Sequence, residues 1–243
     1  MAAGLFDAWT RTFEDERERR ARRGDPRWAL GARLHPSVRR SVQRFQVGED
    51  GDGASLIAKA DGAGDPAYAS AVRLFVDEER NHARLLALLL AAGGASTLRT
   101  HWSDRVFVAL RRLLGLRLEL LVLMIAEVVA LRYYRALRDG TDDALTREVA
   151  GRILADEERH VPFHCARLRQ AFGPLPRPVS ALAVLGWRTA LGAVALVVAW
   201  DHGPALRHLG VGRRAFAAGV VRSSHPIAAD MVREGAARAV CDM

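Results

Sequence analysis

The sequence predicts an all-α protein in which an antiparallel four-helix bundle is followed by additional C-terminal helices. Glu-x-x-His occurs twice, at residues 79–82 and 157–160, and a helix places residues three apart on one face. Glu49 precedes the first motif by 30 residues, and Glu127 precedes the second motif by 30 residues. A step of that length spans one helix, a turn and part of a returning helix, so both acids return to similar heights in an antiparallel hairpin. Helix start and stop signals divide residues 37–172 into four helices.

Residues 1–36 form a charged N-terminal arm, in which acidic and basic residues alternate densely from Arg11 to Arg20. Opposite charges four residues apart support a helix whose surface faces water. We therefore expect a solvated helix that contributes solubility. Docking of a partner protein is the alternative role.

The first bundle helix is predicted from Pro36 to about Ala60, and it is the weakest, because each interior glycine costs about 1 kcal/mol relative to alanine. The glycines that flank Glu49 are Gly48, Gly51 and Gly53. One interpretation is a loop that leaves Glu49 and Asp50 exposed. The repeated spacing favours the alternative interpretation, in which these glycines, having no side chains, let dioxygen, a substrate or another backbone approach a metal ligand. Asp50 or Asp52 remains an alternative ligand.

The second and fourth helices have clear boundaries. Asp65 and Pro66 suit the cap and first turn of the second helix, which ends at the glycine pair 93–94. The fourth helix follows the turn and acidic residues at 139–143 and continues to about residue 172. Pro162 predicts a kink in it, beside the Glu-x-x-His motif.

Ser103 or Asp104 is expected to cap the third helix, which is apolar on nearly all sides from Val106 to Leu137. Glu127 lies inside this apolar segment. An unpaired acid there would cost several kcal/mol in lost solvation, and metal coordination removes that cost. Pairing with an arginine is the alternative.

Residues 173–243 form an apolar C-terminal extension, which prolines at 174, 176 and 178 separate from the bundle. Val179 to Trp200 is long enough to span a membrane, but Arg188 near its centre would cost about 2.5–3.5 kcal/mol on insertion. We therefore expect a helix that covers the bundle, followed by short helices, and consider a membrane partner unlikely.

Composition limits the function classes further. Half of the 243 residues are hydrophobic, which is enough for one good core, and the net charge is +8. Because 35 of the 36 basic residues are arginine, coding bias explains the charge better than a nucleic-acid surface would. Two cysteines are too few for a disulfide scaffold, and residues 1–18 contain no uninterrupted apolar segment typical of a signal peptide. We expect a cytoplasmic protein that binds no nucleic acid.

Glutamate and histidine at these spacings predict a metal site. Its six expected ligands are Glu49, Glu79, His82, Glu127, Glu157 and His160. Carboxylate and imidazole ligands suit iron or manganese rather than a soft metal.

The two runs Glu-Glu-Arg-Asn-His at 78–82 and Asp-Glu-Glu-Arg-His at 156–160 resemble the paired signatures of di-iron oxygenases and acyl-carrier-protein desaturases of the ferritin-like superfamily. The resemblance covers roughly residues 37–172. It implies a site for two iron ions, two manganese ions or a mixed pair. Glu79 and Glu157 would bridge the ions, Glu49 and His82 would complete one coordination sphere, and Glu127 and His160 would complete the other.

Three further residues are expected near these ligands. By the same resemblance, Asp156 would hold the outer nitrogen of a ligand imidazole, although it could be a surface acid beside Arg159. Tyr134 lies on the Glu127 face, where it could hydrogen-bond a carboxylate or simply pack in the core. His164 follows His160 by four residues, and a position on the helix surface is favoured over contact with the site.

The resemblance implies an enzyme that activates dioxygen to hydroxylate, desaturate or N-oxygenate a small organic substrate, with an external electron donor. For that function we expect an apolar substrate pocket beside Glu49 and a small oligomer such as a homodimer. The first alternative is a ferritin-like protein for iron oxidation and storage or peroxide scavenging. The second is a non-enzymatic helical protein that binds a partner or a membrane.

Overall fold

The computed structural model describes residues 3–51, 53–101 and 115–233, and every regular element in these ranges is helical. The predicted all-α class is therefore confirmed. In chain order the elements are α1 (Ala3–Arg23), the 3₁₀ helix η1 (Trp28–Leu30), α2 (Pro36–Glu49), α3 (Ala54–Asp61), α4 (Pro66–Ala92), α6 (Leu116–Gly140), α7 (Ala144–Phe172), α8 (Arg177–Asp201), α9 (Gly203–His208) and α10 (Arg213–Met231).

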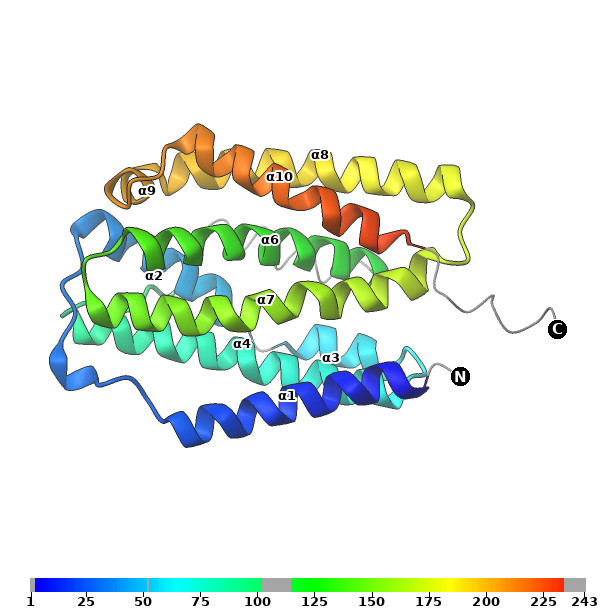
Figure 1. The fold of residues 1–243 in the computed structure, drawn as a ribbon, viewed down its shortest axis with the longest axis horizontal. Coiled ribbons are helices and arrows are strands. Elements are labelled where there is room, and N and C mark those ends of the chain that lie inside the picture. The colour runs from blue at the N-terminus through cyan, green and yellow to red at the C-terminus, as the bar shows by residue number, and fades with distance from the viewer. Residues whose placement is uncertain (1–2, 52, 102–114, 234–243) are drawn as a thin grey trace.

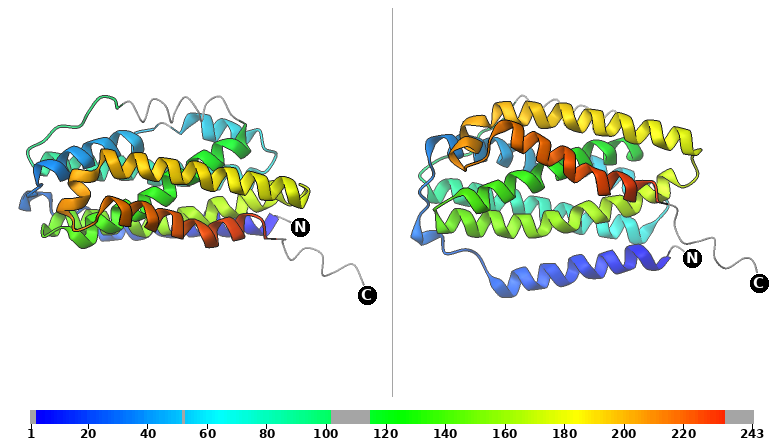
Figure 2. Two further views of the ribbon diagram at one scale, coloured as in Figure 1. Left: turned by 90° about the horizontal axis from the view of Figure 1, so that it is seen from above. Right: turned by 45° about the horizontal axis from the view of Figure 1, so that its top comes forward.

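The long helices run side by side along the molecule (Figure 1). α7 packs most extensively on α6, α2 packs on α4, and α4 also contacts α7. α1 lies along one edge against α4, while α8 and α10 pair along the opposite edge (Figures 1 and 2). The four helices α2, α4, α6 and α7 thus lie between two outer layers.

Local capping explains the sharp starts of α4 and α7. The Asp65 side chain accepts a hydrogen bond from the Tyr68 amide at 3.0 Å, and the Asp143 side chain accepts one from the Thr146 amide at 2.8 Å. These contacts satisfy amides that have no partner within the helix. The helix boundaries predicted from these caps agree with the structure, and α7 continues as one helix through Pro162.

The prediction of one helix from Pro36 to about Ala60 is wrong, because the chain breaks between α2 and α3. Asp50 caps the C-terminus of α2, and α3 begins after Gly53, whose φ of +65° is left-handed. Glycine is needed there for two reasons. It adopts this conformation without strain, and a Cβ at position 53 would lie 2.5 Å from Cγ1 of Val76.

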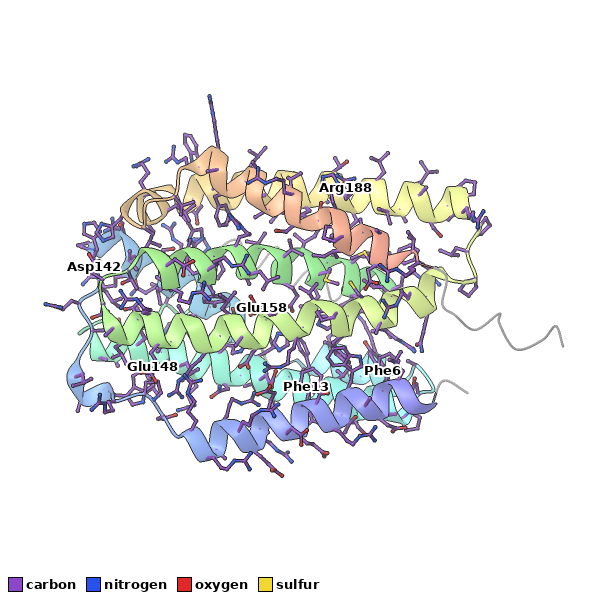
Figure 3. The ribbon with its side chains drawn as sticks, viewed as in Figure 1. Phe6, Phe13, Asp142, Glu148, Glu158 and Arg188 are labelled. Atoms are coloured by element: carbon purple, nitrogen blue, oxygen red, sulfur yellow. The ribbon has the colours of Figure 1, made fainter. Side chains whose placement is uncertain are left out.

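Helix α1 is not a solvated arm. Phe6 and Phe13 are buried, and Figure 3 shows both on the side of α1 that faces the other helices. The Phe6 ring packs edge-on against Tyr68 at 5.0 Å, and the Phe13 ring packs edge-on against Phe163 of α7 at 5.2 Å. Most charged residues of α1 lie on its outer face, whereas its aromatic face belongs to the core of the molecule.

The apolar segment at 179–200 is helical as predicted, but it covers the molecule along one face only. Trp187, Leu191, Ala195 and Ala199 are buried, and the Trp187 indole donates a hydrogen bond to the Leu121 carbonyl at 3.0 Å. Among the described residues α8 is the one helix long and apolar enough to cross a membrane, and 17% of its most apolar window is buried. The predicted start of the third bundle helix, at Ser103 to Val106, lies outside the described residues.

Candidate metal centre

Each of the four inner helices brings acidic or imidazole side chains to one place in the interior. α2 ends in Glu49, and α6 supplies Glu127 from its apolar segment. α4 and α7 each supply one Glu-x-x-His pair, at 79–82 and 157–160, because residues three apart project from the same side of a helix. The structure therefore brings all six expected ligands together.

The six side chains form two overlapping groups. In each group, one potential ligand atom from every member lies within 4.8 Å of the others. The first group is Glu49, Glu79, His82 and Glu157, and the second is Glu79, Glu127, Glu157 and His160. Glu79 and Glu157 belong to both groups, so the arrangement offers two adjacent four-ligand sites that share two carboxylates.

The Nδ1 atoms of both imidazoles face these carboxylates. Nδ1 of His82 lies 3.5 Å from Oε1 of Glu79 and 3.5 Å from Oε1 of Glu157. Nδ1 of His160 lies 3.2 Å from Oε1 of Glu79 and 3.5 Å from Oε2 of Glu127. Both imidazole side chains are fully buried. Each ring therefore presents one nitrogen to the cluster and has its other nitrogen free for an outer partner.

The outer nitrogens bind acids from the opposite helix. Nε2 of His82 on α4 lies 3.1 Å from Oδ2 of Asp156 on α7, and Nε2 of His160 on α7 lies 2.9 Å from Oε2 of Glu78 on α4. When Nε2 carries the proton, the ring is fixed in place and Nδ1 has a lone pair for a metal. The sequence predicts this role for Asp156, whereas Glu78, at the matching position of the repeat, was given no role. The repeat contained the signal, because both acids directly precede the shared glutamates.

Two arginines neutralise these outer acids. Arg20 of α1 binds Glu78, Arg159 of α7 binds Asp156, and Arg20 also lies 3.7 Å from Asp156. Arg159 is held in turn by Glu16 of α1 at 3.3 Å. The contribution of α1 was not predicted. In a segment where charges alternate at nearly every position, nothing distinguishes Arg20 from its neighbours.

Other expected neighbours of the cluster lie at its edges. The Tyr134 hydroxyl donates a hydrogen bond to Oε1 of Glu49 at 2.6 Å. His164 is fully buried, with Nε2 3.8 Å from Oε1 of Glu127, so its favoured position on the helix surface is wrong. Asp50 is exposed at the end of α2, and the alternative ligand Asp52 lies outside the described residues.

Burial and crowding separate the pKa values of the four carboxylates. Burial, followed by the Glu79 carboxylate, raises the pKa of Glu49 to about 8. Burial and the Glu127 carboxylate hold the pKa of Glu157 well above its usual range. Burial also opposes ionisation of Glu79, but the adjacent His160 imidazole lowers its pKa below the usual range. In the protein without metal, burial and crowding thus favour the protonated forms of Glu49 and Glu157, whereas the pKa values of Glu79 and Glu127 are lowered, which favours their ionised forms.

The imidazoles gain protons in the same environment. Burial alone would lower the pKa of His82, but the Asp156 carboxylate on Nε2 and the Glu79 carboxylate raise it well above its usual range. For His160, burial is likewise outweighed by the surrounding glutamates, which raise its pKa well above the usual range. Protons on these side chains thus balance the negative charge of the carboxylates, which metal cations would balance in the loaded protein.

The donor set fits two cations. Within the described part of the chain, five buried atoms of the expected ligands make no hydrogen bond: Oε1 of Glu79, Nδ1 of His82, Oε2 of Glu127, Oε2 of Glu157 and Nδ1 of His160. Buried polar atoms without partners are rare and costly, and metal ions would satisfy these five together. Oxygen and imidazole donors match iron or manganese.

A cavity of about 630 Å³ lies between α1, α4 and α7. Asp156 and Arg159 line it, so it lies behind the imidazole of His82 and not on the side of that ring where the carboxylates meet. Arginines outnumber the acids in its lining, so the cavity carries net positive charge. Beside Glu49, a Cβ at Gly51 would meet no atom within 4 Å. The apolar substrate pocket expected next to Glu49 stays a prediction.

Comparison with protein-family models, with curated proteins and with solved structures gives no match. The function is therefore inferred from the residues of the cluster and their geometry.

Proposed function

We propose that α2, α4, α6 and α7 form a ferritin-like four-helix bundle that binds two iron ions, two manganese ions or one of each, and that the chain is a dioxygen-activating oxidoreductase. The observation that carries the proposal is the pair of four-ligand groups that share Glu79 and Glu157. Four carboxylates balance the charge of two divalent cations, so the loaded centre is neutral and tolerable in a core.

In this proposal Glu79 and Glu157 would be shared by the two ions. Glu49 and His82 would help to hold one ion, and Glu127 and His160 the other. The distances support this division, since Nδ1 of His82 is 4.0 Å from Oε2 of Glu49 and Nδ1 of His160 is 3.5 Å from Oε2 of Glu127. When bound, such an ion pair supplies electrons to dioxygen and the oxidising power for attack on an organic substrate.

The protein's own groups position this centre and govern its protons. Asp156 and Glu78 hold the outer nitrogens of the imidazoles, which keeps both Nδ1 lone pairs directed at the carboxylates. The Tyr134 hydroxyl donates a hydrogen bond to Glu49 and so fixes this expected ligand, the last residue of α2. Phe75 packs edge-on against His160 at 4.7 Å and helps to exclude water from one side of the cluster.

Metal analysis and oxygen reactivity test the proposal. The purified protein is expected to bind about two iron or manganese ions per chain, as the two four-ligand groups require. Exposing anaerobically ferrous-loaded protein to air should change its optical spectrum. Glu127→Ala should lose metal and the spectral change, while Glu158→Ala, an exposed neighbour of Glu157, should retain both.

Two results would decide against the oxidoreductase. Protein that binds no transition metal under these conditions would refute the metal centre itself. A large shell that takes up many iron ions per chain would preserve the metal centre but identify the protein as an iron store.

A further inference from the structure

The outward face of α8 is apolar along its entire length. Seven of the twelve large hydrophobic residues that are exposed in the described structure lie in this one helix. The most exposed are Leu182 at 69%, Leu185 at 61%, Leu196 at 65% and Trp200 at 72%. From residue 178 to 200 the helix contains one ionisable side chain, Arg188, which turns toward His225 of α10. A contiguous apolar surface of this extent marks an interaction site.

Positive charge surrounds this face. Residues 173–233 contain seven arginines and two aspartates, so this segment carries +5 of the protein's net +8. Both aspartates are bound to arginines, Asp201 to Arg44 and Asp230 to Arg169. On α10, which packs along α8, Arg222 is exposed. The basic rim of this face consists of Arg177 at the start of α8, Arg213 beside Trp200 at its end, and Arg222 on the neighbouring α10.

The C-terminal end and the inner side of α8 fix its orientation toward a partner. Trp200 is exposed at the C-terminal end, where the guanidinium of Arg213 lies 4.7 Å from its ring centroid. Tryptophan with an adjacent cation is typical of the boundary between lipid headgroups and acyl chains. The inner side of α8 packs on α10 and α6, so the helix cannot be surrounded by lipid on all sides.

We propose that α8 binds the surface of an anionic lipid membrane and lies in the plane of the headgroups, with its apolar face among the acyl chains. Anionic headgroups complement the arginine rim, and the acyl chains cover the leucines. A second copy of the chain fits less well, because pairing α8 with α8 would place two basic rims against each other. This inference does not depend on the metal centre, which lies in the interior.

Vesicle flotation with the full-length protein tests the proposal. We expect binding to phosphatidylcholine vesicles that contain phosphatidylglycerol, weaker binding to phosphatidylcholine alone, and loss of the difference at high salt. Each leucine removed from the face should lower the partition coefficient about tenfold, so the double variant Leu182→Glu/Leu185→Glu should lose at least about a hundredfold. Arg222→Gln should lower binding to the anionic vesicles about fivefold.

Matched variants elsewhere provide the controls. Leu30→Glu changes a leucine of equal exposure, 68%, in η1, and Arg17→Gln removes an exposed arginine of α1 at the opposite edge. Both should bind vesicles like the unaltered protein. Equal helical circular dichroism and metal content would show that every variant is folded.

Three outcomes would overturn the proposal. The first is that the folded protein does not bind either kind of vesicle. The second is that Leu182→Glu/Leu185→Glu binds as well as Leu30→Glu. The third is that light scattering detects a dimer of the unaltered protein, that Leu182→Glu/Leu185→Glu is monomeric, and that neither the unaltered protein nor the variant binds vesicles. A second copy of the chain would then cover the face.

Discussion

Loading the metal centre should release about four protons at pH 7, because four groups that must become metal ligands hold protons in the metal-free protein. Glu49, with a pKa of about 8, is about nine-tenths protonated at that pH. The raised pKa of Glu157 keeps it protonated, and the raised pKa values of His82 and His160 keep both imidazoles charged. Coordination through a carboxylate oxygen or through Nδ1 displaces each of these protons.

The charge balance supports the same number. In the metal-free protein at pH 7 the ionised groups of the centre are Glu78, Glu79, Glu127, Asp156, Arg20, Arg159, His82 and His160, which sum to zero. Two divalent cations add four positive charges and the departing protons remove about four, so the loaded centre is again neutral. Release of fewer protons would leave uncompensated positive charge in a buried place.

Isothermal titration with manganese measures this release. Titrations at pH 7 in buffers with different enthalpies of ionisation give a heat that varies linearly with buffer enthalpy, and the slope is the number of protons released. Four protons also mean that the combined binding free energy of the two ions strengthens by about 5 kcal/mol per pH unit, since one proton contributes about 1.4 kcal/mol.

The test has a control variant and a result that would refute the predicted proton release. Glu158→Gln alters an exposed acid next to Glu157 and should leave the slope unchanged. A slope of about one proton or fewer would refute the reasoning. It would mean either that the ions bind elsewhere or that the cluster is already deprotonated without metal.

Further predictions concern stability and affinity. Phe13→Ala should destabilise the fold by about 3–5 kcal/mol in urea, because this ring is 1% exposed. Gly140→Ala should cost about 1–3 kcal/mol, since a Cβ there collides with the backbone carbonyl of Leu209, which follows α9, whereas Gly151→Ala, with 3.6 Å of clearance, should be neutral or slightly stabilising. Asp156→Asn should weaken metal binding about 10–100-fold in a competition titration. Burial lowers the pKa of His202 to about 4, so stability should fall by about 3 kcal/mol as pH drops from about 6.5 to about 4, and His202→Gln should lack this loss.

The helices that were predicted well are those whose boundaries depend on neighbouring residues. Asp65 and Asp143 cap amides only three residues away, so the starts of α4 and α7 can be read from the sequence. The break after Glu49 also had a local signal in its glycines. The spacing of the acids favours a continuous helix, but it requires α2 to continue only as far as Glu49 itself.

The six expected ligands could be chosen from spacing because a helix converts sequence separation into position on a face. The outer contacts could not, since they depend on which helices meet. Glu78 reaches His160 across 82 residues of chain, and Arg20 reaches Glu78 across 58. Phe6 and Phe13 did carry a periodic signal, being seven residues apart, but the dense charges around them obscured it.

The buried position of Glu78 makes α1 part of the metal centre's stability. Glu78 is fully buried, and it contacts His160, whose other nitrogen faces the metal ligands, Arg20 of α1 and, at 3.6 Å, Arg159 of α7. If α1 detached, Glu78 would lose its nearest arginine and would share Arg159 with Asp156. Removing one partner from a buried ion pair is strongly destabilising. Glu78 would then compete for the imidazole proton and loosen the orientation of His160. The N-terminal helix therefore stabilises the ligand geometry from outside the bundle, through one arginine and one carboxylate.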